Sequence, residues 1–365
     1  MSETLRFWIS IGGSFIAATV LSFLLTPLAI RIAHKVGAVD VPRDNRRAHT
    51  TPTPRMGGVA IFTACLIAFF GVGYALWGKL DSSFLFILIG SLILVVMGIL
   101  DDIYTLKPLL KLVIQFAAAL IPALNGVTIS RLTNLFSPSA PRIELGIWSI
   151  PITVLWIVSI TNALNWLDGL DGLACGISAI SAFCMFIISL TNSQDTSTIA
   201  LVCLFGSCLG FFPFNRHPAK TFMGDTGSLF LGYMLGALSV QGMFKLYAAV
   251  YFLIPVVLLA LPLGDMIVTI FRRILTGHNP MHADRSHIHH RLIDMGFSHR
   301  QVVSILHGFS FLLGCIAMVF TMKGCLRLVF LAVSILFLVF FLLYFRRQYN
   351  NRKPLSSPTH SESKQ

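Results

Sequence analysis

Charged residues are scarce in this chain of 365 residues: only 12% are Asp, Glu, Lys or Arg, whereas 55% are hydrophobic. Soluble domains carry about a quarter charged residues. This shortage excludes a disordered chain, and it argues strongly against a water-soluble globule. We therefore expect a protein whose solvent is the lipid bilayer.

Several motifs of well-known enzyme classes are also missing. The seven cysteines form no CxxC pair, and nearly all of them sit in apolar runs, so we expect small buried residues rather than disulfides or a zinc site. No Walker A, GxGxxG or HExxH sequence occurs. Nucleotide binding and metalloprotease chemistry by those routes are therefore excluded.

Long hydrophobic runs are abundant instead. A run of roughly 17 to 25 residues is long enough to cross the hydrocarbon core as a helix. The first run lacks a short apolar core and an A-x-A cleavage site, so we expect it to be retained as a span. Eleven candidate spans are predicted, at about 7–30, 57–76, 84–100, 109–124, 150–159, 172–190, 199–212, 228–239, 246–271, 305–321 and 328–345.

Lys and Arg gather in alternate segments, above all 31–56, 272–304 and the residues after 345. The positive-inside rule predicts that these segments face the cytoplasm, with the N-terminus outside and the C-terminus inside. The net charge of +12 then reflects membrane orientation rather than nucleic-acid binding. Most Asp and His residues fall on the same predicted inner side, so polar chemistry is concentrated there.

The one long predicted outer segment is 125–149. In it, GVTISRL and RIELGIW flank the turn-rich stretch FSPSAPR, a pattern that favours a short external β-hairpin. The last residues, LSSPTHSESKQ, are polar and poor in hydrophobic side chains. We expect a disordered polar tail over 346–365, after one integral membrane domain over 1–345.

Two adjacent carboxylates, Asp101 and Asp102, close an apolar run in the motif GILDD. An aspartate at the centre of a membrane helix costs about 2.5 to 3.5 kcal/mol, so this pair should lie at the membrane boundary. Two like charges this close call for a compensating cation or a proton. A solvated helix end is the simpler alternative.

The motif NALNWLDGLDG places Asn162, Asn165, Asp168 and Asp171 at steps of three. In helical geometry the first three side chains and, less tightly, Asp171 stack on one face. They form a cluster of oxygen ligands, with no Lys or Arg between 160 and 171 to neutralise it. Mg²⁺, a hard oxygen-seeking ion, would neutralise it. A capped helix with turn residues explains only one Asn and one Asp.

The segment FNRHPAKTFMGDTGS leads into another apolar run. Gly224 and Gly227 permit close backbone approach, and a helix N-terminus attracts phosphate. Asp225 is a poor neighbour for phosphate unless a divalent ion bridges the two. Phe222 is either a core residue or a platform on which a base stacks, and the sequence pattern alone favours core.

The longest predicted inner loop contains DRSHIHHR, with His287, His289 and His290 beside Arg285 and Arg291. Three histidines suit a transition metal, but the arginines repel a cation and favour a phosphate dianion. A second basic cluster has two equally good explanations, a loop whose positive charge orients the protein in the membrane and a phosphate-binding site. Its residues are Arg46, Arg47, His49 and Arg55.

Taken together, these four motifs resemble those of the polyprenyl-phosphate N-acetylhexosamine-1-phosphate transferases, glycosyltransferase family 4. The resemblance runs from about Asp40 to Arg291 and is closest to the bacterial undecaprenyl-phosphate N-acetylglucosaminyl transferase branch. It implies an all-α polytopic protein of the bacterial inner membrane with its active site on the cytoplasmic face. In such proteins, undecaprenyl phosphate attacks the β-phosphorus of UDP-GlcNAc, and UMP leaves. The product begins O-antigen or enterobacterial common antigen synthesis.

The resemblance also implies roles for particular residues. Asp225 and Asn165 would bind Mg²⁺ or Mn²⁺. Asp101 would act as the base for the lipid phosphate, with Asp102 as its supporting carboxylate.

The remaining implied roles concern the walls of the site. Asp168 and Asp171 would shape it, while Phe222 would stack on uracil with Asn215 nearby. Phosphates or the sugar would be held by Lys111, His287, His289, His290 and Arg291. Members of the family also suggest a homodimer.

Ile288 interrupts the histidine run, whereas the related transferase for UDP-MurNAc-pentapeptide carries an uninterrupted run. The residue favours the GlcNAc branch, with the MurNAc-pentapeptide enzyme and other HexNAc transferases as alternatives. An ion-coupled transporter is the distant alternative. Transporter sites lie near the bilayer midplane, whereas these carboxylates cluster at predicted cytoplasmic helix ends.

Overall fold

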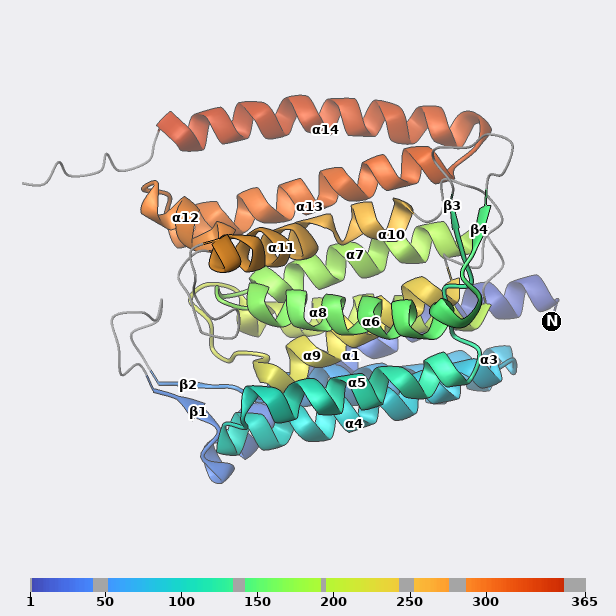
Figure 1. Ribbon diagram of the computed structural model, residues 1–365, viewed down its shortest axis with the longest axis horizontal. Coiled ribbons are helices and arrows are strands. Elements are labelled where there is room, and N and C mark those ends of the chain that lie inside the picture. Colours follow the sequence, from blue (N-terminus) through green and yellow to red (C-terminus); the bar gives the residue numbers. More distant parts are fainter. Residues whose placement is uncertain are drawn as a thin grey trace, which may run out of the picture.

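The computed structural model describes residues 2–41, 52–133, 142–191, 195–242, 253–275 and 287–350. Within these ranges the chain is almost entirely helical, as the apolar runs predict. The helices lie roughly side by side in one bundle, with a short pair of strands at each end (Figure 1).

The helices differ widely in length. A π-helical turn, Phe69–Tyr74, continues α2 into α3, and a 3₁₀ turn, Gly146–Trp148, precedes α6. The helices are α1 (Glu3–Val36), α2 (Gly57–Ala68), α3 (Ala75–Trp77), α4 (Ser82–Tyr104), α5 (Pro108–Leu124), α6 (Ser149–Leu167), α7 (Leu173–Leu190), α8 (Asp195–Asn215), α9 (Gly224–Gly242), α10 (Leu253–Leu258), α11 (Ala260–Leu275), α12 (Ile288–Asp294), α13 (His299–Thr321) and α14 (Gly324–Asn350).

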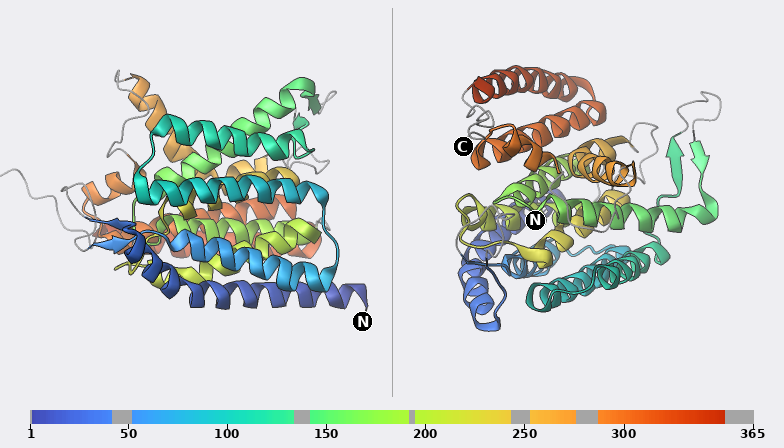
Figure 2. Two further views of the ribbon diagram at one scale, coloured as in Figure 1. Left: turned by 90° about the horizontal axis from the view of Figure 1, so that it is seen from below. Right: turned by 60° about the vertical axis from the view of Figure 1, so that its left-hand side comes forward.

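Eight of the described helical segments are long and apolar enough to cross a bilayer, and α5 is a shorter apolar helix of 17 residues. The protein is therefore an all-α polytopic membrane protein, as predicted. The count of eleven spans and the outside N-terminus stay predictions. Helix α14 runs to Asn350, beyond the expected span end at residue 345, and packs against α13 at one edge of the bundle (Figure 2). The rest of the predicted tail lies outside the described residues.

Two predicted spans differ from the observed helices. The run at 150–159 belongs to the longer α6, because the polar residues that follow it continue the helix and face protein. In the described part of the run at 246–271, α10 and α11 are separate helices with a break at Leu259. Pro262 has no N–H to donate to the carbonyl of Leu258, and its ring crowds the preceding turn.

The predicted β-hairpin in 125–149 is confirmed. Strands β3 (Arg131–Thr133) and β4 (Arg142–Glu144) pair antiparallel, and Arg131 Nε lies 2.7 Å from Glu144 Oε1 across the pair. The sequence did not predict the second strand pair, β1 (Val39–Asp40) with β2 (Thr53–Pro54), at the other end of the bundle.

Helix α9 is the centre of the bundle. Its residues from Thr226 to Gly242 are all buried, and it packs against α2, α4, α6 and α7. Glycines allow this close packing at the first turn of α9. A Cβ on Gly98 of α4 would lie 2.4 Å from Thr226 Cα, and one on Gly58 of α2 would lie 2.1 Å from Gly227 N. The start of α9 is thus held between two helices that approach it backbone to backbone.

We expect Gly98→Ala to lower the melting temperature of the purified protein, because the added methyl group must push α4 away from α9. Overpacking of this kind costs about 1–3 kcal/mol. Gly12→Ala is the matched control, because a Cβ there would meet nothing within 4 Å. Thermal unfolding in detergent is the measurement, and equal melting temperatures for the two variants would contradict the packing described.

Candidate active site

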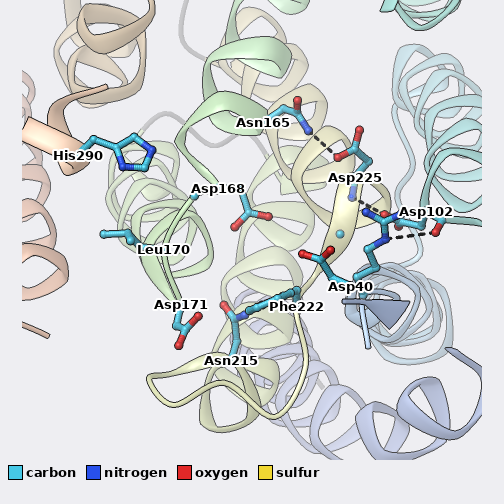
Figure 3. A pocket seen from close by; sticks show the side chains of 13 residues that line it. Asp40, Asp102, Asn165, Asp168, Leu170, Asp171, Asn215, Phe222, Asp225 and His290 are labelled. Carbon is cyan, nitrogen blue, oxygen red and sulfur yellow. Dashed lines mark hydrogen bonds between the residues drawn. The ribbon is translucent and has the colours of Figure 1, made fainter. Parts of the chain in front are cut away.

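A polar cavity of about 340 Å³ opens at the end of the bundle where α4, α6 and α8 end and α9 begins. The side chains of Asp168, Asn165 and Asp225 point into the same region of it (Figure 3). The cavity is lined by Asp40, Arg55, Asp102, Asn165, Asp168, Gly169, Leu170, Asp171, Asn215, Phe222, Gly224, Asp225 and His290. Members of every motif identified in the sequence meet here.

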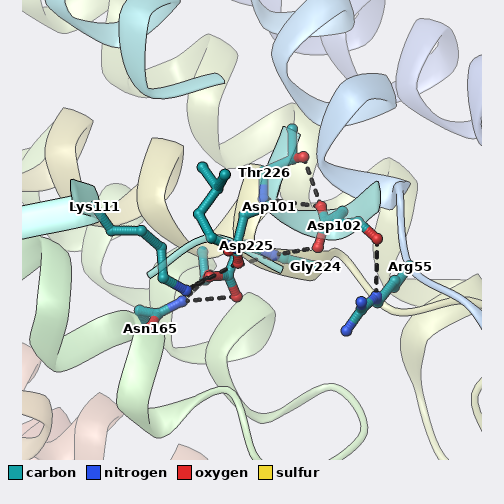
Figure 4. Close-up of polar contacts among 10 residues, drawn as sticks. Arg55, Asp101, Asp102, Lys111, Asn165, Gly224, Asp225 and Thr226 are labelled. Carbon is teal, nitrogen blue, oxygen red and sulfur yellow. Dashed lines mark hydrogen bonds and ion pairs between the residues drawn. The ribbon is translucent and has the colours of Figure 1, made fainter. Parts of the chain in front are cut away.

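Asp102 holds the start of α9. Its carboxylate accepts hydrogen bonds from the backbone N–H of Asp225 (2.9 Å) and Thr226 (3.1 Å) and from the Thr226 hydroxyl (2.7 Å) (Figure 4). The first N–H groups of a helix lack partners within it and carry partial positive charge, so Asp102 acts as an N-cap supplied by another helix. Gly224 makes room, since a Cβ there would lie 2.4 Å from the carboxylate.

Lys111 links two other carboxylates. Its Nζ lies 2.9 Å from Asp101 Oδ2 and 2.8 Å from Asp225 Oδ2. The second oxygen of Asp101 accepts a hydrogen bond of 2.7 Å from the backbone N–H of Leu106. The adjacent aspartates of GILDD are therefore compensated separately, Asp101 by an ammonium group and Asp102 by a helix N-terminus.

Asn165 and Asp225 lie together, although 60 residues separate them in the chain. Asn165 Nδ2 donates to Asp225 Oδ1 at 3.2 Å and to Ser228 Oγ at 2.9 Å. The amide of Asn162 donates instead to the side chain of Gln115 and to the carbonyl of Val158. The two asparagines of NALN thus have different surroundings despite their shared helix.

Asp168 is the C-cap of α6 and follows its last residue, Leu167. Burial raises the pKa of its carboxyl well above the usual range, and the nearby charge of Asp225 raises it further. The expectation that Asp171 shares the same helical face is wrong. The helix ends at Leu167, and the chain turns through Gly172, whose φ is +77°, before α7 begins.

Asp171 fixes the loop between α8 and α9. Its Oδ2 lies 2.7 Å from His217 Nδ1 and accepts a hydrogen bond of 3.2 Å from the backbone N–H of Ala219. The His217 ring stacks on His299 at 4.3 Å between centroids. Asp171 therefore fastens the turn after α6 to the loop before α9.

Phe222 and Asn215 form one wall of the polar cavity (Figure 3). Phe222 is half-buried rather than a core residue, and its backbone N–H donates to the carbonyl of Pro54 in β2 at 2.8 Å. Asn215 is 2% exposed, and its amide donates to the Thr221 carbonyl. Its Oδ1 is buried and has no hydrogen-bond partner among the described residues.

The three histidines of the DRSHIHHR motif lie in three different environments, and that of His287 is described in the next paragraph. His290 lines the polar cavity, whereas His289 is buried against Gly169, where a Cβ would lie 2.5 Å from its Nε2. Burial lowers the pKa of His289 to about 3, so this ring is neutral at pH 7. Arg291 is exposed and lines neither this cavity nor the one described next. Arg285 and the basic cluster 46–49 lie outside the described residues.

His287 lines a second, apolar cavity of about 560 Å³ between α5, α6 and α11. Most of its lining is hydrophobic, with a few polar groups. The lining residues are Pro108, Lys111, Leu112, Gln115, Phe116, Leu155, Val158, Ser159, Asn162, Asn165, Trp166, Asp225, Leu229, Met266, Ile270, Arg273 and His287. Asn165 and Asp225 line both cavities, so the polar and apolar spaces meet at these two residues.

Sequence reasoning gave no role to Asp265 or Arg273, although α11 brings both close to the site. Arg273 lines the apolar cavity and lies over the Trp166 ring at 5.4 Å. Asp265 binds His287, as described below. A carboxylate inside an apolar run was the available signal for Asp265, because such residues usually face protein and serve a function.

Comparisons of the sequence with known proteins identify the family. Residues 84–243 match the sequence pattern of glycosyl transferase family 4. A probable undecaprenyl-phosphate N-acetylglucosaminyl 1-phosphate transferase of Bacillus subtilis (strain 168) is 38% identical over 306 residues, which is 84% of each chain. A decaprenyl-phosphate N-acetylglucosaminephosphotransferase of Mycobacterium leprae (strain TN) is 34% identical over 317 residues, 80% of this chain and 79% of the relative.

A phospho-N-acetylmuramoyl-pentapeptide-transferase of Clostridium beijerinckii (strain ATCC 51743 / NCIMB 8052) is 30% identical over 328 residues, 85% of this chain and 97% of the relative. All three relatives are named as transferases of phosphorylated N-acetylated sugars, and the alignments extend over most of each protein. The family expected from the four motifs is thereby confirmed. The chain belongs to glycosyl transferase family 4 and is a multi-pass membrane phosphotransferase.

Proposed function

We propose that the protein transfers GlcNAc-1-phosphate from UDP-GlcNAc to undecaprenyl phosphate, giving undecaprenyl-pyrophosphoryl-GlcNAc and UMP. One observation carries the proposal: a polar cavity and an apolar cavity meet at Asn165 and Asp225. The reaction joins a water-soluble nucleotide sugar to a membrane lipid. Two spaces of opposite character that meet at one pair of polar residues suit these substrates.

The polar cavity suits the nucleotide. Phe222 offers a ring face on which a base can stack. The buried, unpartnered Oδ1 of Asn215 on the same wall can accept a hydrogen bond from the imide N–H of uracil. Arg55, whose Nε donates to the Asp102 carbonyl at 3.2 Å, lines the same cavity and supplies a cation for the diphosphate.

The apolar cavity suits the polyprenyl chain. Its walls from α5, α6 and α11 carry Leu112, Phe116, Leu155 and Ile270. Lys111 lies where this cavity meets the polar one. A lipid phosphate at this boundary would reach the ammonium group while the chain stays in apolar surroundings.

The two residues at the junction, together with Asp168 in the polar cavity, fit a divalent ion. Asp225, Asp168 and Asn165 offer carboxylate and amide oxygens, the ligands that Mg²⁺ prefers, and Mn²⁺ accepts the same donors. We propose Asp225 and Asn165 as the ligands, and when bound the ion would neutralise charge on the transferred phosphate. Lys111 forms an ion pair with Asp225 in the structure, so one cation already offsets part of this negative cluster.

The chain's own groups then position and deprotonate the acceptor. Asp101 is proposed to take the proton of the acceptor phosphate, with Lys111 holding its carboxylate in place. The freed phosphate oxygen forms a bond to the β-phosphorus, the bond from that phosphorus to the bridging oxygen breaks, and UMP departs. We favour this direct displacement over a covalent phospho-enzyme, because positioning and charge neutralisation supply most of the catalysis in phosphoryl transfer.

The choice of GlcNAc rests on Ile288 within the histidine run and on relatives named for GlcNAc transfer. The alternative is UDP-MurNAc-pentapeptide, because one relative is named for that substrate. The names of the three relatives carry no O-antigen or enterobacterial common antigen pathway, so the proposal ends at the lipid-linked product. We propose the bacterial inner membrane with the site on the cytoplasmic face, on the distribution of Lys and Arg. A homodimer stays a prediction.

With Mg²⁺ and undecaprenyl phosphate, we expect the purified protein to release UMP and label the lipid from UDP-GlcNAc. A panel of UDP-GlcNAc, UDP-GalNAc and UDP-MurNAc-pentapeptide, analysed by thin-layer chromatography of the lipid products, measures the preference. Product from UDP-MurNAc-pentapeptide alone would replace the proposed donor. No product from any donor would reject the transfer reaction.

We expect Asp225→Asn and Asp101→Asn each to lower kcat by about a hundredfold or more, the scale found when a group that stabilises transition-state charge is lost. Asp294→Asn is the control, because Asp294 is exposed at the end of α12. UMP release at saturating substrates is the measurement, with melting temperature as a check on folding. Near-normal rates in both site variants would remove these residues from the proposed chemistry.

Removal of divalent ions with a chelator should abolish product formation, and added Mg²⁺ or Mn²⁺ should restore it. The reason is that two anionic substrates must meet in a cavity that already contains several carboxylates. Full activity after exhaustive chelation would contradict the proposed metal ion and would show that Lys111 and the other cationic side chains alone neutralise the substrate charges.

A further inference from the structure

Asp265 in the middle of α11 holds His287 with both carboxylate oxygens. Its Oδ2 lies 2.8 Å from His287 Nδ1, and its Oδ1 accepts a hydrogen bond of 2.7 Å from the backbone N–H of Ile288. Both side chains are nearly enclosed, with exposures of 6% for Asp265 and 10% for His287. The carboxylate thus caps α12 and orients the imidazole at the same time.

This pairing decides which ring nitrogen of His287 faces a ligand. Nδ1 carries the proton donated to Asp265, because an ionised carboxylate can only accept. Nε2 points away from Asp265, on the opposite side of the ring, and no described residue forms a hydrogen bond with it. A carboxylate that fixes the tautomer and the orientation of a histidine is a recurring device in catalytic and metal sites.

His287 lies on the apolar side of the site. His287 lines the apolar cavity together with Lys111 and Arg273, and its ring packs edge-on to Trp166 at 6.0 Å. His290, by contrast, lines the polar cavity. The two histidines therefore line different cavities, although only two residues lie between them.

We propose that His287 binds the phosphate of the polyprenyl acceptor through Nε2, and that Asp265 is the residue that positions it. The proposal rests on the function proposed above and assigns this histidine to the lipid rather than to the nucleotide sugar. In the proposed complex the ring donates from both nitrogens, Nδ1–H to Asp265 and Nε2–H to a phosphate oxygen, so the carboxylate balances the charge of the bound imidazolium. Lys111 and Arg273 supply further positive charge around the same headgroup.

The test uses Asp265→Asn. The asparagine oxygen can still accept from the N–H of Ile288, so α12 keeps its cap. The amide has no charge to balance an imidazolium and donates to Nδ1, so His287 is left with a neutral Nε2–H, which binds a phosphate more weakly than a charged one. We expect the KM for undecaprenyl phosphate to rise about tenfold, on the scale of one impaired hydrogen bond to a charged group, while the KM for UDP-GlcNAc changes less than about twofold.

Asp81→Asn is the matched control, because Asp81 also caps a helix, α4, with a hydrogen bond from Ser83 N at 3.0 Å, far along the chain from the site. Both KM values should stay unchanged in it. His287→Ala should raise the acceptor KM by at least as much as Asp265→Asn does. The double variant Asp265→Asn with His287→Ala should be no worse than His287→Ala, because Asp265 acts through that ring.

Other outcomes would overturn the inference. A rise in the KM for UDP-GlcNAc in Asp265→Asn would assign His287 to the donor, and additive losses in the double variant would leave Asp265 with a structural role only. Failure of the underlying function gives a different result: the wild-type protein would form no lipid product at all. UMP binding by each variant, measured by calorimetry, checks that the polar cavity remains intact.

Discussion

The site depends on the bond between a buried carboxylate and the N-terminus of a buried helix. Asp102 satisfies the first N–H groups of α9, and the partial positive charge of those groups offsets its own negative charge. The contact fixes the position of Asp225 in the first turn of α9, and therefore where Asp225 meets Asn165 and Lys111. Gly58 of α2 and Gly98 of α4 also fix this position, because they let the backbones of these helices approach the first turn of α9.

Around that fixed point the fold separates two environments. The turns after α6 and α8 bring carboxylates and an aromatic ring to a cavity at the end of the bundle, while α5, α6 and α11 leave an apolar space along it. The histidine segment before and within α12 contributes to both. A reaction between a soluble anion and a lipid anion needs this division, because a polar cavity does not suit a polyprenyl chain and an apolar cavity does not suit a nucleotide sugar.

The sequence predicted the membrane helices, the β-hairpin and the gathering of the four motifs at one end, because composition and periodicity determine which segments span and which loops are polar. It could not predict the partners of individual carboxylates. Asp101 and Asp102 are neighbours in the chain, yet one meets Lys111 and the other meets α9. Such partners depend on tertiary packing, as does the break at Leu259, where two short helices replace one long span.

The complete burial of α9 has a consequence for the response of this protein to its membrane. Acyl chains of the bilayer have no contact with the buried length of this helix, so a thicker or thinner bilayer can reach Asp225 only through the surrounding helices. Helices α5 and α11, by contrast, expose apolar side chains such as Leu109 and Phe271 on the outside of the bundle. Bilayer thickness should therefore alter the fit of the acceptor before it disturbs the carboxylates.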